Sequence, residues 1–243
     1  SVERIMRSEG NDVAAIIVEP VMANYGIIPP REGFLKGLRE IADRYGALLI
    51  LDEVVTGYRL GLGGAQRYYG VNADITTLGK IIGGGFPIGA VGARDEIMDL
   101  LSPRGPVFNA GTFNGHPISM VAGLATIEVL ETTNAYDIAI GASRKLAEGL
   151  SDILGRFGID HVVNWVPTML QVFFTKGEVI DHETASKSDT RLYLRLHEEL
   201  LKRGVFIAPS QFEAMFTSSS HTNDIVEETL RQVEDSAKAL RQV

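Results

Sequence analysis

The sequence has no cysteine among its 243 residues. A disulfide framework, a thiolate metal site and a cysteine nucleophile are therefore excluded. A chain of this length buries enough apolar surface to fold without such cross-links. The absence of cysteine also fits a reducing compartment, so we expect a cytoplasmic location.

Positive charge and long apolar runs are also scarce. The 23 lysines and arginines are outnumbered by 31 acidic residues, which gives a net charge of −8. This balance argues against binding to nucleic acid or to a membrane surface. No apolar run approaches the length of a membrane span, and residues 1–10 lack the hydrophobic stretch of a signal peptide.

The first part of the chain, residues 1–130, alternates short apolar runs with helical patterns. This pattern predicts an α/β fold with a mostly parallel sheet. Strands are expected at residues 14–18, 47–51, 74–78 and 88–92. The first two are unbroken apolar runs, typical of strands that are covered on both faces. Apolar residues at helical spacing predict a helix between them, and Gly46 stands where it should end.

The second part, residues 131–243, predicts a smaller C-terminal α+β domain. Helices are expected at residues 135–154 and 189–204 and after the capping sequence at 221–223, with strands at 168–174 and 205–208.

Lys80 is the first candidate for chemistry. It lies in the segment TTLGKIIGGG and is the only lysine between Lys36 and Lys145. The usual role of a lysine is a solvated surface side chain. Here the glycines leave room for a flat ligand, and an apolar setting favours the uncharged amine, which is nucleophilic towards an aldehyde.

Two acidic residues follow predicted strands. Asp52 comes directly after the buried run 47–51, and Glu19 follows the run 14–18. Carboxylates at the carboxyl ends of parallel strands lie where open α/β sheets bind their ligands. Asp52 is therefore a candidate partner for a protonated ring nitrogen, and Glu19 points to the same crevice. A capping role for Asp52 and a strand-terminating role for Glu19 fit the local sequence equally well.

A glycine–threonine turn at Gly111-Thr112 precedes a helical pattern rich in small residues. Backbone N–H groups and the Thr112 hydroxyl could together bind a phosphate. The five histidines are scattered and form no cluster with metal-ligand spacing, so no metal site is predicted.

These motifs, in this order, closely resemble the class III aminotransferases, pyridoxal phosphate enzymes of fold type I. The resemblance runs essentially from end to end. It is carried by segments VEPV (18–21), LILDEVVTGYR (49–59), TTLGKIIGGGFPIG (76–89), GTF (111–113) and APSQFEA (208–214). It implies the partial large domain of that fold followed by the smaller C-terminal domain.

The resemblance also implies roles for single residues. Lys80 would hold pyridoxal 5′-phosphate as a Schiff base and move protons. Asp52 would pair with the pyridine nitrogen, Val54 would pack on one ring face, and Asn24 would lie near the phenolic oxygen. Thr112 would bind the cofactor phosphate of a neighbouring subunit, which implies a homodimer with shared active sites.

Glu213 separates relatives within the family. Aminotransferases of this class use an arginine in this region to hold an α-carboxylate, whereas the aminomutase branch carries a glutamate in Ser-x-Phe-Glu-Ala, as at Ser210–Ala214. A carboxylate favours a substrate end that bears ammonium and disfavours a second carboxylate. The resemblance thus implies an isomerase of tetrapyrrole synthesis. It would convert (S)-4-amino-5-oxopentanoate, an amino-aldehyde, to 5-aminolevulinate, with pyridoxamine 5′-phosphate as the other cofactor form.

Two alternatives remain open. One is an ω-aminotransferase or an amino-acid racemase on the same scaffold. The other is a catalytically inert, truncated chain, because family members begin with an N-terminal segment and the first half of the large domain, and we expect these to be missing before Ser1.

Overall fold

The computed structural model describes residues 1–241, which form two compact units. Unit 1 comprises residues 1–20 and 31–132, and unit 2 combines residues 21–30 with the chain from residue 133 onward. The sequence suggested a boundary near residue 130, with residues 21–30 in the first part. The structure differs for this segment because Ile28 packs in a buried cluster with Phe173 of the second unit.

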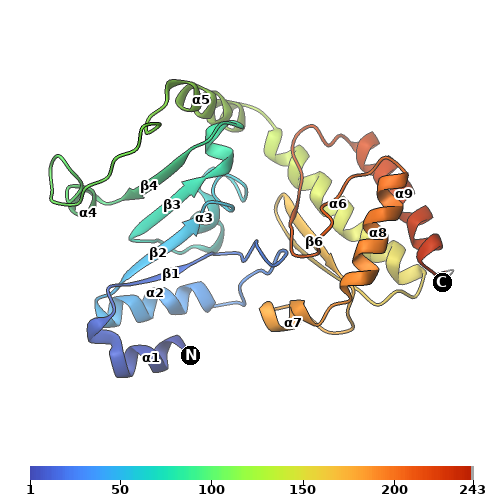
Figure 1. The fold of residues 1–243 in the computed structure, drawn as a ribbon, viewed down its shortest axis with the longest axis horizontal. Coiled ribbons are helices and arrows are strands. Elements are labelled where there is room, and N and C mark those ends of the chain that lie inside the picture. The colour runs from blue at the N-terminus through green and yellow to red at the C-terminus, as the bar shows by residue number, and fades with distance from the viewer. Residues whose placement is uncertain (242–243) are drawn as a thin grey trace. The chain divides into compact units, whose positions relative to one another are not determined.

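Unit 1 contains a four-stranded sheet in the order β1-β2-β3-β4 (Figure 1). Its strands are β1 (Ala15–Val18), β2 (Leu48–Glu53), β3 (Ile75–Gly79) and β4 (Gly89–Ala93). The first three run parallel, and β4 pairs antiparallel with β3. The predicted, mostly parallel sheet is confirmed.

The helical elements of unit 1 lie between these strands and after them. They are α1 (Val2–Glu9), η1 (Gly10–Asp12), α2 (Phe34–Tyr45), α3 (Gly64–Tyr69), η2 (Lys80–Gly83), α4 (Asp95–Met98) and α5 (Pro117–Thr132). The buried face of α2 carries Leu35, Leu38 and Ala42, which pack in one cluster with Leu49 and Leu51 of β2. Burial of each leucine contributes about 1.5–3 kcal/mol, and this contribution fixes α2 on the sheet.

Only one face of β2 is deeply buried within the described residues. Leu49, Leu51 and Glu53 are buried, whereas the alternate residues, Asp52 among them, are only half-buried. On β1, the side chain of Ile17 is 65% exposed. The expectation that these strands are covered on both faces is therefore not met by residues 1–241, and Asp52 lies on the more open face.

Unit 2 contains an antiparallel sheet of β5 (Val162–Val166), β6 (Met169–Phe173) and β7 (Met215–Phe216). Its helices are α6 (Ala135–Arg156), α7 (His182–Ser186), α8 (Thr190–Lys202) and α9 (Asn223–Arg241), as Figure 1 shows. Leu170 and Val172 of β6 share a buried core with Leu154, Leu196 and Val233 from α6, α8 and α9. The predicted α+β character of this part is confirmed.

The predicted strand at residues 205–208 is wrong. Two carbonyl groups of this segment accept hydrogen bonds from side chains of α8 instead of from a neighbouring strand. The Tyr193 hydroxyl donates to Ala208 O at 3.1 Å, and His197 Nδ1 lies 2.8 Å from Ile207 O. The sheet is completed by β5 and β7, which the sequence pattern did not predict.

Candidate active site

Glu53 and Asp52 end β2 with their side chains on opposite faces of the sheet. The Glu53 carboxylate is 1% exposed. It accepts hydrogen bonds from Ala65 N at 2.6 Å, from the Thr56 hydroxyl at 3.1 Å and from Gln66 N at 3.3 Å. Glu53 therefore satisfies the free N–H groups at the start of α3 and has a structural role.

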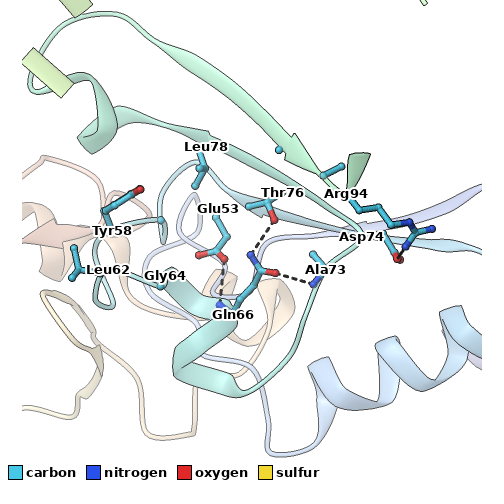
Figure 2. A pocket seen from close by; sticks show the side chains of 14 residues that line it. Glu53, Tyr58, Leu62, Gly64, Gln66, Ala73, Asp74, Thr76, Leu78 and Arg94 are labelled. Atoms are coloured by element: carbon cyan, nitrogen blue, oxygen red, sulfur yellow. Dashed lines mark hydrogen bonds and ion pairs between the residues drawn. The ribbon is translucent and has the colours of Figure 1, made fainter. Parts of the chain in front are cut away.

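A pocket of about 360 Å³ opens on the Glu53 side of the sheet (Figure 2). Its polar groups are largely paired with one another. Gln66 donates to the Thr76 hydroxyl at 3.0 Å and accepts from Ala73 N at 2.8 Å, and Arg94 forms an ion pair with Asp74 at 2.9 Å. None of the candidate residues from the sequence lines this pocket, so it is not the predicted cofactor site.

On the other face, Asp52 is held by one of its two oxygens. Oδ1 accepts from Val54 N at 3.1 Å and from the Thr77 hydroxyl at 3.0 Å. The bond from Val54 N closes a local turn, which agrees with the capping role that the sequence also allowed for Asp52. Oδ2 accepts no hydrogen bond from residues 1–241 and is free to pair with a cationic group.

Lys80 follows β3 directly and begins η2. Its backbone has a φ of +50°, one of three such values at non-glycine residues in the described chain. The left-handed region costs such a residue about 1–2 kcal/mol, and strain of this kind concentrates at functional sites. The Lys80 side chain is exposed, and its amine makes no hydrogen bond or ion pair within residues 1–241.

Strand pairing places the unit 1 candidates at one edge of the sheet. Asp52 pairs with Thr77 three residues before Lys80, and Val18 pairs with Leu51, so that Glu19 and Asp52 follow paired positions. Val54 borders the same edge, since a Cβ added at Gly79 would lie 3.3 Å from its Cγ1. The structure thus brings Glu19, Asp52, Val54 and Lys80 to the carboxyl ends of parallel strands, where such sheets bind ligands.

Thr112 is placed differently. It lies in an exposed turn that precedes α5, and its hydroxyl makes no hydrogen bond within the described chain. No hydrogen bond or ion pair in residues 1–241 joins it to the other candidates.

The two remaining candidates lie together in unit 2. Asn24 and Glu213 are both exposed, and their segments are joined by a hydrogen bond from Gly26 N to Phe212 O at 2.7 Å. The Tyr25 ring meets the Phe212 ring edge-on, with 5.6 Å between the ring centres. The chain's own contacts therefore link the segments of Asn24 and Glu213.

Two residues to which the sequence pattern gave no role each contact a candidate residue or the loop that carries one. The Thr77 hydroxyl donates to Asp52. The Gln171 amide of β6 donates to the backbone of the loop that carries Glu213 (residues 208–214). Thr77 could have been found from the sequence, because it carries a hydroxyl on the predicted strand that follows the Asp52 strand. The signal for Gln171 was a single polar residue inside an otherwise apolar strand.

Neither a metal-binding cluster nor a helix that could span a membrane occurs in the described residues. Across residues 1–241, no group of three or more His, Asp or Glu side chains is placed to hold a metal ion. In the same residues, no helix combines the length and apolar character needed to cross a bilayer.

The side chains at the sheet edge fit pyridoxal phosphate. Within residues 1–241 the Lys80 amine and Asp52 Oδ2 form no hydrogen bond or ion pair, and the aliphatic Val54 lies beside the glycine that precedes the lysine. This cofactor needs an amine for its aldehyde, an anion for its ring nitrogen and an apolar contact for its ring.

The fold and this sheet edge define a domain of the transaminase type. The structure is similar to an omega-transaminase from Sphaerobacter thermophilus, with a TM-score of 0.92 and 31% identity over 99% of this chain and 55% of that one. A variant glutamate-1-semialdehyde-aminomutase from Pseudomonas aeruginosa in complex with PMP gives a TM-score of 0.86 and 27% identity over 98% of this chain and 54% of that one.

The chain belongs to the aminotransferase class-III family, whose model matches residues 1–233. It is 63% identical to a glutamate-1-semialdehyde 2,1-aminomutase from Hyperthermus butylicus over 99% of this chain. The match spans 57% of that relative, so this chain corresponds to little more than half of its length. The family resemblance seen in the sequence is confirmed.

Proposed function

We propose that the protein is a pyridoxal-phosphate-dependent aminomutase that converts (S)-4-amino-5-oxopentanoate to 5-aminolevulinate for tetrapyrrole synthesis. One observation carries the proposal. Lys80, Asp52 and Glu213 occur together in a chain that is 63% identical to a relative of that name. The free amine of Lys80 and the free oxygen of Asp52 support it further.

Lys80 and Asp52 carry the chemistry in this proposal. When bound, pyridoxal phosphate supplies an electron sink for bonds at the amine-bearing carbon. Lys80 holds the cofactor covalently and moves protons to and from the reacting carbons. Asp52 Oδ2 would pair with the ring nitrogen and keep it protonated, and the Thr77 hydroxyl donates to Oδ1 and fixes the carboxylate in position.

The remaining residues orient the cofactor and the substrate. Val54 would pack on the ring, Glu19 lies at the same sheet edge, and Asn24 would bind near the phenolic oxygen. Glu213 selects a substrate end that bears ammonium and disfavours a second carboxylate. Such selection matters because the enzyme moves an amine within one molecule and needs no α-keto acid partner.

The proposal includes a homodimer and a cytoplasmic location. Thr112 binds the cofactor phosphate of a neighbouring subunit, and its exposed turn and unengaged hydroxyl support this role. The cysteine-free composition supports a reducing compartment.

The test supplies the semialdehyde to the full-length protein loaded with cofactor, without any keto acid. We expect 5-aminolevulinate to form at every turnover. If none forms while the cofactor is bound, the proposed function is wrong.

An ω-aminotransferase is the second candidate, favoured by the TM-score of 0.92 to an enzyme of that kind. An amine–keto acid exchange assay separates the two, since only the transaminase depends on an external acceptor. A racemase would instead invert a single amino acid without exchange. An inert chain would show neither reaction and no absorbance from a lysine-bound cofactor.

A further inference from the structure

Gln171 is a fully buried polar residue in the middle of an apolar strand. All five residues of β6 are buried, and the exposed fraction of Gln171 is 0%. Its neighbours Leu170 and Val172 point into the core formed with the helices. Because side chains alternate along a strand, Gln171 points to the opposite face, as does Phe173.

The Gln171 amide is fully engaged on that face. Its nitrogen donates to Gln211 O at 2.8 Å and to Glu213 O at 2.5 Å. Its oxygen accepts from Val172 N at 2.9 Å. One side chain therefore fixes the backbone on both sides of Phe212. Removing it leaves two carbonyl groups without their buried donor, a loss larger than that of an exposed hydrogen bond.

The same face holds the segment that carries Asn24. Gly26 has a φ of +78°, and a Cβ built there would lie 2.3 Å from the Phe173 ring and 3.1 Å from Gln171 Cγ. The segment thus rests directly on Gln171 and Phe173. From this position Gly26 N donates to Phe212 O, on the loop that Gln171 holds.

The loop is also anchored where it begins. The buried Tyr193 donates its hydroxyl hydrogen to Ala208 O at 3.1 Å, and burial raises the pKa of Tyr193 to about 12. The phenol therefore remains a donor at every physiological pH. Between this anchor and β7, the buried Gln211 amide donates to Ala185 O at 3.3 Å, and the Gln171 amide bonds the backbone of Gln211 and of Glu213 itself.

We propose that Gln171 is a positioning residue. It holds the loop that carries Glu213 and, through the Phe212–Gly26 hydrogen bond, the segment that carries Asn24 in one fixed arrangement. The inference rests on the proposed function for the roles of these two residues. Its physical content, that one buried amide fixes both segments, is independent of it.

The first test measures amide hydrogen exchange in the full-length protein. Gln171→Ala should speed exchange at Gly26 and Glu213 by about tenfold or more. The matched control is Ser143→Ala, which also removes a fully buried polar group in unit 2, here a hydroxyl that accepts from Trp165 Nε1 and Thr168 N. The control should leave exchange at Gly26 and Glu213 unchanged. Unchanged exchange in Gln171→Ala overturns the proposal.

The second test measures selectivity, as kcat/KM for the semialdehyde relative to an α-amino acid donor. Gln171→Ala and Glu213→Ala should each lower this ratio about tenfold or more, whereas Ser143→Ala should not. The double variant should lose little beyond Glu213→Ala alone, because both changes act through the same carboxylate. Fully additive losses overturn the proposal.

The two proposals fail separately. A wild-type protein that forms no 5-aminolevulinate overturns the proposed function, and hydrogen exchange then decides alone whether Gln171 fixes the loop. If the wild-type protein is active and Gln171→Ala leaves exchange at Gly26 and Glu213 unchanged, only the role of Gln171 is overturned.

Discussion

Thr77 donates its hydroxyl hydrogen to Asp52 Oδ1 over 3.0 Å, across the parallel pair β2 and β3. The bond joins the proposed partner of the cofactor nitrogen to the strand that leads into Lys80. It leaves Oδ2 free and fixes the direction in which that oxygen points. The two residues proposed to hold the cofactor are therefore positioned by one strand pairing.

Substitutions of Asp52 and Thr77 should lower kcat to different extents, because they remove different interactions. Asp52→Asn should lower kcat by about 10²-fold or more, since the ring nitrogen would lose the anionic partner proposed for it. Thr77→Val keeps the carboxylate but removes one hydrogen bond, so the loss should be about tenfold or less. Steady-state kinetics on cofactor-loaded protein measures both. Equal losses in the two variants would contradict the proposal that the negative charge of Asp52 stabilises the protonated ring nitrogen.

The backbone of Lys80 should reveal its strain when the side chain is removed. Lys80→Gly and Lys80→Ala both delete the amine, but only glycine adopts the φ of +50° without cost. Urea unfolding of the cofactor-free protein should therefore show Lys80→Gly to be about 1 kcal/mol more stable than Lys80→Ala. The opposite order would mean that this backbone conformation is not strained.

Glu53 should be necessary for stability and unnecessary for chemistry. Glu53→Gln replaces an acceptor-only group, buried among three donors, with an amide that presents its own N–H groups to them. The free energy of unfolding should fall by about 1–3 kcal/mol, and kcat of the folded fraction should change little. A large fall in kcat without loss of stability would place Glu53 in the catalytic site.

The Asp74 carboxyl should make stability depend on pH. Burial alone would raise its pKa, but hydrogen bonds from Leu49 N and Arg39 outweigh burial and hold the pKa below its ordinary value of 3.8. A group with a lowered folded pKa stabilises the protein above its unfolded pKa, and this contribution disappears as pH falls through the folded pKa.

Asp74→Asn should therefore destabilise the protein near neutral pH, and the difference from wild type should shrink below about pH 4. Asp160→Asn is the matched control, because Asp160 is exposed and its one ion pair within residues 1–241 is with the exposed Lys176 at 3.5 Å. It should change stability by less than about 0.5 kcal/mol. Chemical unfolding at several pH values tests both, and a pH-independent Asp74→Asn difference would refute the linkage.

Local patterns in the sequence predicted much of unit 1. The apolar runs became β1 and β2, and Gly46 ends α2 with a φ of +68°, as the helical spacing indicated. The placement of Asp52 at the sheet edge followed from the position of one residue after an apolar run. These features depend on neighbours in sequence, which a single chain displays directly.

The features that the sequence did not predict depend on distant neighbours. Residues 205–208 have the composition of a strand, but Tyr193 and His197 occupy two of their carbonyls. Glu53 and Asp52 are adjacent carboxylates in the sequence. The structural role of Glu53 depends on α3, whose Ala65 N donates to its carboxylate. Likewise, nothing near Gln171 in sequence indicates that its amide holds a loop about forty residues further on.

The central claim, that Lys80 is the cofactor lysine, is tested most directly by reduction and peptide mapping. The full-length protein is incubated with pyridoxal phosphate, treated with borohydride, digested and analysed by mass spectrometry, with Lys80→Ala as the control. The account predicts a phosphopyridoxyl group on the peptide that contains Lys80 and no stoichiometric label in the control. A stoichiometric label on another lysine, or none on Lys80, would contradict it.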